Sequence, residues 1–206
     1  MAASADPGPI DDVIVHTRLE DGRKVCLRAV RPGDGVRLRD GIQQLSQESR
    51  YLRFFSVAPV PPDHVIEKLV RVDGHRHLAW GAILSDDPEE TAIGVVHAIR
   101  SDEAQPRAEF AVGVLDAYHG QGLARMLTAV LLIHCQHEGI AALDAQILAE
   151  NAPAIGFIRS LGGERCASEK GVADFALGVG PALLALQASD EPAGLAAVFE
   201  GLGAYL

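Results

Sequence analysis

A glycine-spaced turn between an apolar strand and a long apolar helix is the feature that most constrains this fold. The strand is expected to end near Leu115 and the helix to begin at Leu123. Between them, Gly120 and Gly122 lack a β-carbon, so the chain can turn sharply and its N–H groups can approach a ligand closely. The helix directs the positive end of its dipole at the same place. The sequence therefore predicts an anion-binding site, such as one for phosphate, at this turn.

Two common phosphate motifs do not fit these residues. No Gly-Lys-Ser/Thr follows the glycines, and the third glycine of a dinucleotide fingerprint is missing, which argues against a nucleoside triphosphate and against NAD. The segment His119-Gly120-Gln121-Gly122-Leu123-Ala124 resembles instead the Gln/Arg-x-x-Gly-x-Gly/Ala pyrophosphate loop of the GNAT acetyltransferase superfamily, with His at the first position. This resemblance implies acetyl-CoA as the co-substrate. The cofactor-binding residues that it implies are Val112, Gly113, Val114, His119, Gly120, Gln121, Gly122, Leu123, Ala124, Arg125 and Asn151.

Composition and charge fit a single domain and exclude some partners. A chain of 206 residues with 48% hydrophobic content can bury one substantial core and is short for two. The net charge of -10 disfavours nucleic acid, which needs a basic face, and favours an amine substrate. Cys26, Cys135 and Cys166 are widely spaced, which fits the reduced thiols of a cytoplasmic protein. Residues 1–12 are expected to be a flexible leader, neither signal peptide nor membrane span.

The apolar pattern predicts an α/β chain of the α+β type. Asp21-Gly22 indicates an opening hairpin, Asp34 and Ser46 are expected to cap two helices, and a third is expected over 63–72. Three strands in a meander are expected over 78–84, 91–99 and 108–115, followed by a helix over 123–137. A strand over 141–148, a helix over 153–161 and two strands over 164–167 and 173–178 complete the domain. This order is that of the GNAT fold, a mixed, mostly antiparallel sheet with helices on both faces, expected here over residues 13–180. In that fold the sheet splays after its fourth strand to admit the pantetheine arm.

The next helix carries one match to the family and one departure from it. Glu150-Asn151-Ala152-Pro153-Ala154 resembles the segment in which a family Asn binds the pantetheine or phosphate region, while Asn151 suits an N-cap equally well. Ile158 stands where many members have a tyrosine that protonates the leaving thiolate. Either the thiolate leaves without a dedicated acid, or Tyr51, Tyr118 or Tyr205 supplies one.

Glu109 is the candidate general base. It is a carboxylate within an otherwise apolar strand, and apolar surroundings would raise its pKa toward the working pH, so that it could accept a proton from an ammonium directly or through water. The alternative is that Glu109 faces solvent or pairs with Arg107. Segments 45–55, 72–79 and 108–116 resemble the GNAT domain of bacterial protein lysine acetyltransferases, in which a glutamate at this position is the base.

The resemblance implies that acetyl passes from acetyl-CoA to a primary amine by direct attack in a ternary complex, the acceptor being a lysine-bearing protein. A small-molecule amine acetyltransferase and a non-catalytic acyl-CoA-binding sensor are the alternatives. No nucleic-acid or membrane partner is expected.

Histidine spacing and the C-terminal segment complete the predictions. His75 with His77, and His134 with His137, have spacings that could bind a metal. Neither pair has a third ligand nearby in the sequence, so surface or helix-capping positions and no metal site are expected. Residues 181–206 are expected to form a helical extension with an apolar stripe. Packing on the parent domain is the simpler expectation, and a homodimer contact or a wall beside the acceptor site is the alternative.

Overall fold

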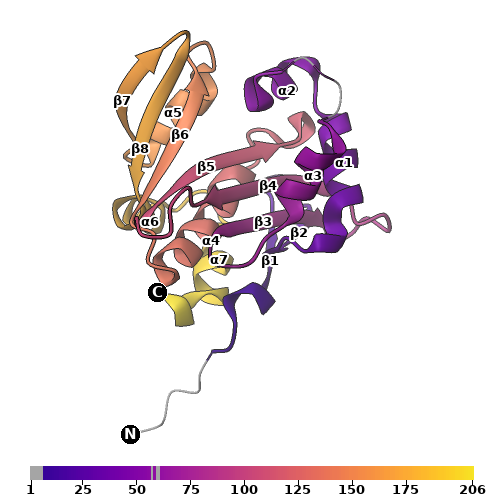
Figure 1. Ribbon diagram of the computed structural model, residues 1–206. Helices are drawn as coiled ribbons and strands as arrows, with labels where there is room; N and C mark the ends of the chain where they lie inside the picture. The colour runs from indigo at the N-terminus through magenta and orange to yellow at the C-terminus, as the bar shows by residue number, and fades with distance from the viewer. Residues whose placement is uncertain (1–6, 57, 59–60) are drawn as a thin grey trace, which may run out of the picture.

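One eight-stranded sheet organises the molecule (Figure 1). The computed structural model describes residues 7–56, 58 and 61–206. Within these residues the strand order is β1-β2-β3-β4-β5-β6-β8-β7, and every neighbouring pair is antiparallel except β5 and β6. The strands are β1 Ile14–Arg18, β2 Lys24–Ala29, β3 His77–Leu84, β4 Ala92–Ile99, β5 Arg107–Val114, β6 Ala142–Leu148, β7 Glu164–Glu169 and β8 Val172–Gly178.

Helices cover both faces of this sheet. In the described residues they are α1 Gly35–Gln44, α2 Gln47–Phe54, α3 Asp63–Val70, α4 Leu123–His137, α5 Ala152–Ser160, α6 Val179–Gln187 and α7 Leu195–Gly201. The central helix α4 packs on β3, β4 and β5, and α1 contacts β4 from the opposite face. Because successive side chains of a strand alternate between faces, β3 sends Trp80 into the main core and Ala79 into a smaller cluster with Val30 and Val70.

The central helix is buried on almost every side. Its bounds agree with the prediction, and every residue from Met126 to Cys135 is buried. A helix that is apolar all round needs cover beyond the sheet. That cover comes from α6 and α7, which both contact α4, and α7 also contacts β1. Leu195, Val198 and Leu202 of the C-terminal segment are buried in the main core.

Two local expectations need revision. Asp34 was expected to cap α1, but it makes no side-chain cap there. Its carboxylate accepts instead from the Arg28 guanidinium at 2.7 and 2.8 Å and from the Arg31 N–H at 2.8 Å, because β2 brings Arg28 beside it. In the predicted leader, Ile10 is buried in the core and opens a 3₁₀ turn, η1 Ile10–Asp12. The expectation of a flexible leader is therefore wrong at residues 10–12, and its part that falls on residues 1–6 lies outside the described residues.

The sheet opens between β5 and β6. These parallel strands pair only at their beginnings, over Arg107↔Ala142, Ala108↔Leu143 and Glu109↔Asp144. Beyond that point β5 continues with β4 alone, and β6 continues with β8. Figure 1 shows β6, β7 and β8 leaning away from β5. The second half of β5 therefore has a free backbone edge, where another extended chain can pair.

Candidate functional site

A cleft of about 970 Å³ lies where the two strands part. Its walls come from the second half of β5, the middle of β6, the turn before α4 and the start of α5. This volume is that of a site for a cofactor or substrate rather than for a single ion. The cleft brings together most of the residues predicted to bind the cofactor, namely Val112, Gly113, Val114, His119, Gly120, Gly122, Leu123, Ala124, Arg125 and Asn151.

The turn before α4 presents unpaired backbone donors to this cleft. Gly120 and Gly122 have φ angles of 70° and 77°, in the left-handed region that favours glycine. Within the described residues, the N–H groups of 120–124 donate to no protein acceptor. Gly122 is the N-cap of α4, so the N–H groups of the first turn of the helix, at Leu123 and Ala124, point in the same direction as the positive end of the helix dipole. An anion, such as a phosphate, would satisfy them.

Side chains around the turn hold its shape. Gln121 does not line the cleft, because its side-chain oxygen accepts from the Asp21 N–H at 3.0 Å and ties the turn to the β1–β2 hairpin. The His119 Nε2 lies 2.9 Å from the carbonyl oxygen of Val114, so this nitrogen stabilises the end of β5 rather than being free for a phosphate. Arg125 lines the cleft, and its Nε is buried without a partner among the described residues.

Asn151 serves as a helix cap at the edge of the cleft. Its side-chain oxygen accepts from the Ala154 N–H at 3.1 Å, and Pro153 stands in the first turn of α5. The residue also lines the cleft. The capping role is therefore present, and it leaves the amide nitrogen of Asn151 available to a ligand.

Glu109 lies in surroundings different from those predicted. Its side chain is exposed and does not line the cleft, so the expected apolar environment is wrong. The reason is that Glu109 lies on the β5 face opposite Phe110, at the last register before β5 and β6 part. Arg107 does not pair with it, since the Arg107 Nε donates to Asp144 at 3.0 Å. Glu109 interacts electrostatically with Arg53.

Arg53 was missed by the sequence analysis. It extends from α2 into both the cleft and a smaller neighbouring pocket, and its guanidinium lies over the Phe54 ring, 5.0 Å from the ring centroid. No hydrogen bond or ion pair to Arg53 is found within the described chain. Burial lowers the pKa of Arg53 to about 10, with Glu109 opposing the shift, so the side chain is a cation at neutral pH. Nothing local in the sequence marks this arginine.

Asp116 fixes α2 beside the cleft. Its carboxylate accepts from the Ser46 N–H at 3.0 Å, the Ser46 hydroxyl at 2.8 Å and the Ser49 hydroxyl at 2.6 Å. Burial alone would raise the pKa of Asp116, but these hydrogen bonds outweigh it and lower the pKa to about 2. Ser46 also caps α2 by accepting from the Ser49 N–H, as predicted. The start of α2 is thereby tied to the end of β5.

The position expected to hold an acid for the leaving thiolate is apolar. Ile158 lines the cleft and is 1% exposed. Of the tyrosines, Tyr118 lines the cleft, and its ring lies under the Arg23 guanidinium at 4.3 Å. The Tyr205 hydroxyl donates to carbonyl oxygens of Pro7 and Gly8, and Tyr51 is exposed on α2 without lining the cleft.

The histidines are more buried than expected. His77 and His134 are buried rather than on the surface, because β3 and α4 carry them inward. The His134 Nδ1 accepts from the Trp80 indole N–H at 3.1 Å, and the His77 Nε2 lies 2.9 Å from the His97 Nδ1. In the part of the chain that the structure describes, no group of three metal-ligating side chains occurs.

Comparison with known proteins identifies the family. The model of the Acetyltransferase (GNAT) family matches residues 42–162, more than half of the chain. The chain therefore belongs to the GNAT acetyltransferase family, and the predicted fold is confirmed. It is 28% identical over 151 residues to Acetyltransferase Pat of Mycolicibacterium smegmatis, a match that covers 73% of this chain and 42% of that protein. It is 30% identical over 122 residues to Acetyltransferase PA5475 of Pseudomonas aeruginosa, covering 59% of this chain and 64% of that one.

Solved structures share the fold. The GNAT domain of S. lividans PAT superposes with a TM-score of 0.74 at 24% identity, covering 84% of this chain and 99% of that domain. Spermidine N-acetyltransferase from Vibrio cholerae, solved in complex with CoA and spermine, superposes with a TM-score of 0.60 at 17% identity. The match covers 77% of this chain and 98% of that protein. The chain spans about two fifths of the length of Acetyltransferase Pat and about two thirds of the length of Acetyltransferase PA5475. Among the helices of the described residues, none is sufficiently long and apolar to span a membrane.

Proposed function

We propose that this chain is a cytoplasmic N-acetyltransferase that moves acetyl from acetyl-CoA to a primary amine, the acceptor being a lysine side chain of a protein. The observation that carries the proposal is the cleft at the parting of β5 and β6, with unpaired N–H groups of 120–124 at one end and the free edge of β5 along one wall. The unpaired N–H groups complement a pyrophosphate. The free strand edge complements an extended chain that contains amide groups.

Each part of the cleft has a role in this proposal. The turn donors and Arg125 would hold the pyrophosphate, and the β5 edge at Val112–Val114 would pair with the pantetheine arm. A backbone N–H near Val114 would polarise the thioester carbonyl. The pantetheine would then bring the thioester beside Gly113 and Arg53, at the α2 side of the cleft.

The chemical step needs one base and no metal in this proposal. The neutral amine attacks the thioester carbonyl carbon, the C–N bond forms, the C–S bond breaks, and the thiolate leaves with the electron pair. Glu109 accepts the proton that the ammonium must lose, and because Glu109 is exposed we expect a water molecule to carry it. Because Ile158 offers no acidic group, we expect the thiolate to leave unprotonated, and Tyr118, which lines the cleft, is the alternative acid.

The lysine acceptor rests on resemblance and on charge. Segments 45–55 and 72–79 resemble protein lysine acetyltransferases, and α2, which the first segment contains, borders the cleft. The chain carries a net charge of -10, which attracts cationic acceptors. A small polyamine is the second candidate acceptor, since a spermidine N-acetyltransferase shares the fold.

Acetyl transfer can be tested with matched acceptors. Acetyl-CoA would be incubated with the protein and with a lysine-bearing protein, spermidine or an aminoglycoside, and products would be measured by mass spectrometry. We expect acetylated lysine, at a rate that falls as salt rises, because screening weakens the attraction between exposed charges. Acetylation confined to a small amine would overturn the lysine assignment. Tight acyl-CoA binding without turnover of any amine would instead support a sensor.

A further inference from the structure

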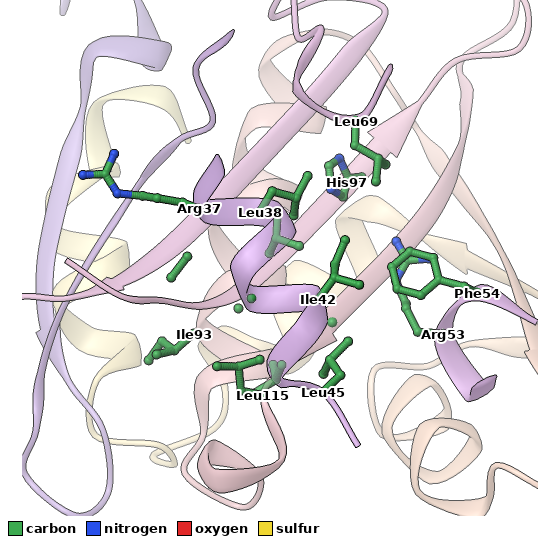
Figure 2. A pocket seen from close by; sticks show the side chains of 16 residues that line it. Arg37, Leu38, Ile42, Leu45, Arg53, Phe54, Leu69, Ile93, His97 and Leu115 are labelled. Carbon is green, nitrogen blue, oxygen red and sulfur yellow. The ribbon is translucent and has the colours of Figure 1, made fainter. Parts of the chain in front are cut away.

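A small side pocket lies beneath α1, next to the cleft (Figure 2). Its volume is about 50 Å³, and four residues line both cavities, namely Leu45, Arg53, Gly113 and Val114. The side pocket and the cleft meet at these four residues. In the proposed function, on which this inference rests, the acyl end of the thioester lies at this part of β5. A water molecule needs roughly 10–15 Å³ of cavity volume measured in this way, so the pocket has room for about three to five heavy atoms. The methyl of an acetyl group would leave most of it empty.

The side pocket contains a hydrogen-bond acceptor that nothing satisfies. His97 is 1% exposed and lines the pocket. The His77 Nδ1 lies 3.1 Å from the Arg71 carbonyl oxygen, so that nitrogen carries the proton. Neutral His77 therefore accepts at Nε2, and the His97 Nδ1 donates to it at 2.9 Å. The remaining His97 Nε2 keeps its lone pair and has no partner in the described chain.

Arg53 supplies the complementary donors. Its guanidinium makes no hydrogen bond or ion pair within the described residues, and it lies close to β5, with its Nε 3.7 Å from the place where a β-carbon on Gly113 would be. Arg53 and His97 interact electrostatically, and Figure 2 shows both at the same pocket. The other walls are mainly apolar, with Leu38, Ile42 and Leu69 among them. Arg37 also lines the pocket, but its guanidinium is already paired with Asp34 and Glu90.

The two polar groups select among ligands. An ammonium group would be repelled by Arg53, so the acceptor amine does not belong here. A carboxylate would set a lone pair against the His97 Nε2. A plain alkyl chain would leave a buried acceptor and a cation unpaired, at the cost of their desolvation. A hydroxyl group satisfies both, because its oxygen accepts from Arg53 while its proton is donated to the His97 Nε2.

We propose that the side pocket receives the chain of a short hydroxyacyl group of about four carbons. The enzyme then transfers this hydroxyacyl group from its CoA thioester more efficiently than the plain acyl group of equal length. A 3-hydroxybutyryl thioester fits this description, since it extends acetyl by two carbons and one oxygen. The bonds made and broken are those of acetyl transfer, and Arg53 and His97 keep their protonation states. Water is the competing occupant of the pocket.

The test compares three thioesters with one amine acceptor. We expect kcat/KM for 3-hydroxybutyryl-CoA to exceed that for butyryl-CoA by about tenfold or more, as for one hydrogen bond to a charged group. Leu69→Phe, which fills the pocket, should lower the ratio of 3-hydroxybutyryl to acetyl transfer at least tenfold. Val36→Phe is the matched control, because Val36 lies on α1, is 70% exposed and does not line the pocket. It should leave that ratio unchanged.

A second pair of variants separates polarity from size. Arg53→Met and His97→Leu should bring the 3-hydroxybutyryl to butyryl ratio close to one, and urea unfolding would verify that each variant is folded. Equal use of the two four-carbon thioesters by the wild type would overturn the proposal. If no amine is acylated, calorimetric titration of the same thioesters still tests the proposal. A preference for 3-hydroxybutyryl-CoA in binding would support the role of the side pocket. Equal affinities would overturn that role, and acetyl transfer by the same protein would show that the proposed function stands nevertheless.

Discussion

The side chain of Glu109 lies on the exposed face of β5. The residue stands between buried Ala108 and buried Phe110, yet its own side chain is exposed, because a strand with one buried face sends alternate residues to the other. Its electrostatic neighbour is Arg53 of α2, which lies 56 positions earlier in the numbering. The role proposed for Glu109 therefore depends on access to the amine rather than on a buried environment.

Replacing Glu109 by glutamine tests that role. We expect Glu109→Gln to lower kcat/KM for acetyl transfer by about a hundredfold or more, the usual contribution of a general base, while the affinity for acetyl-CoA stays the same. Steady-state kinetics across pH and calorimetry measure the two effects. The control is Glu103→Gln, an exposed carboxylate that pairs with Arg76 at 3.1 Å. An undiminished rate with an unchanged pH profile would assign the proton to another group or to bulk water.

The turn between β5 and α4 contains two glycines that differ in the space around them. A β-carbon on Gly122 would lie 2.3 Å from the Pro192 side chain, whereas one on Gly120 would meet nothing within 4 Å. The sequence indicated that both serve ligand binding. The structure adds that Gly122 also permits the C-terminal segment to pack against the turn, so a bulky side chain at 122 is expected to disturb the fold as well as the site.

Alanine at each glycine separates these constraints. Gly120→Ala should weaken acetyl-CoA binding and lower the free energy of unfolding by about 1 kcal/mol, the cost of a left-handed residue with a β-carbon. Gly122→Ala should lose the same affinity and distinctly more stability, because Pro192 must move. Calorimetry and urea unfolding provide the two readouts. If the two variants were equally stable, the contact with Pro192 would not constrain the turn.

The whole molecule buries neutral histidines on both sides of its sheet. Burial lowers the pKa of His77 and His134 and lowers that of His97 well below its usual range, with Arg53 and His77 adding to the effect at His97. In the unfolded chain these groups bind protons below about pH 6.5. The unfolded state then binds more protons than the native state, so stability falls as the pH falls through and below that value.

This linkage predicts an acid-sensitive fold. At pH 5.5 a histidine that stays neutral in the native state should cost roughly 1.4 kcal/mol of stability relative to pH 7.5. Urea unfolding at the two pH values measures the loss, and His97→Leu should make it smaller by about that amount. Stability that is equal at both pH values would mean that these histidines bind protons in the folded protein. The carboxylates with lowered pKa, such as Asp116, lose their contributions only at more acidic pH.

The sequence by itself determined what local chemistry sets. The glycine-spaced turn, the bounds of α4, the Ser46 and Asn151 caps and the order of strands and helices all follow from turn residues, capping residues and apolar periodicity, which act over a few positions. Only the tertiary structure decided which side chains meet. Arg53 with His97, Asp116 with Ser46, and Trp80 with His134 join residues far apart in the chain, and the parting of β5 from β6 depends on register. These contacts leave no local pattern, because each forms only when separate elements pack.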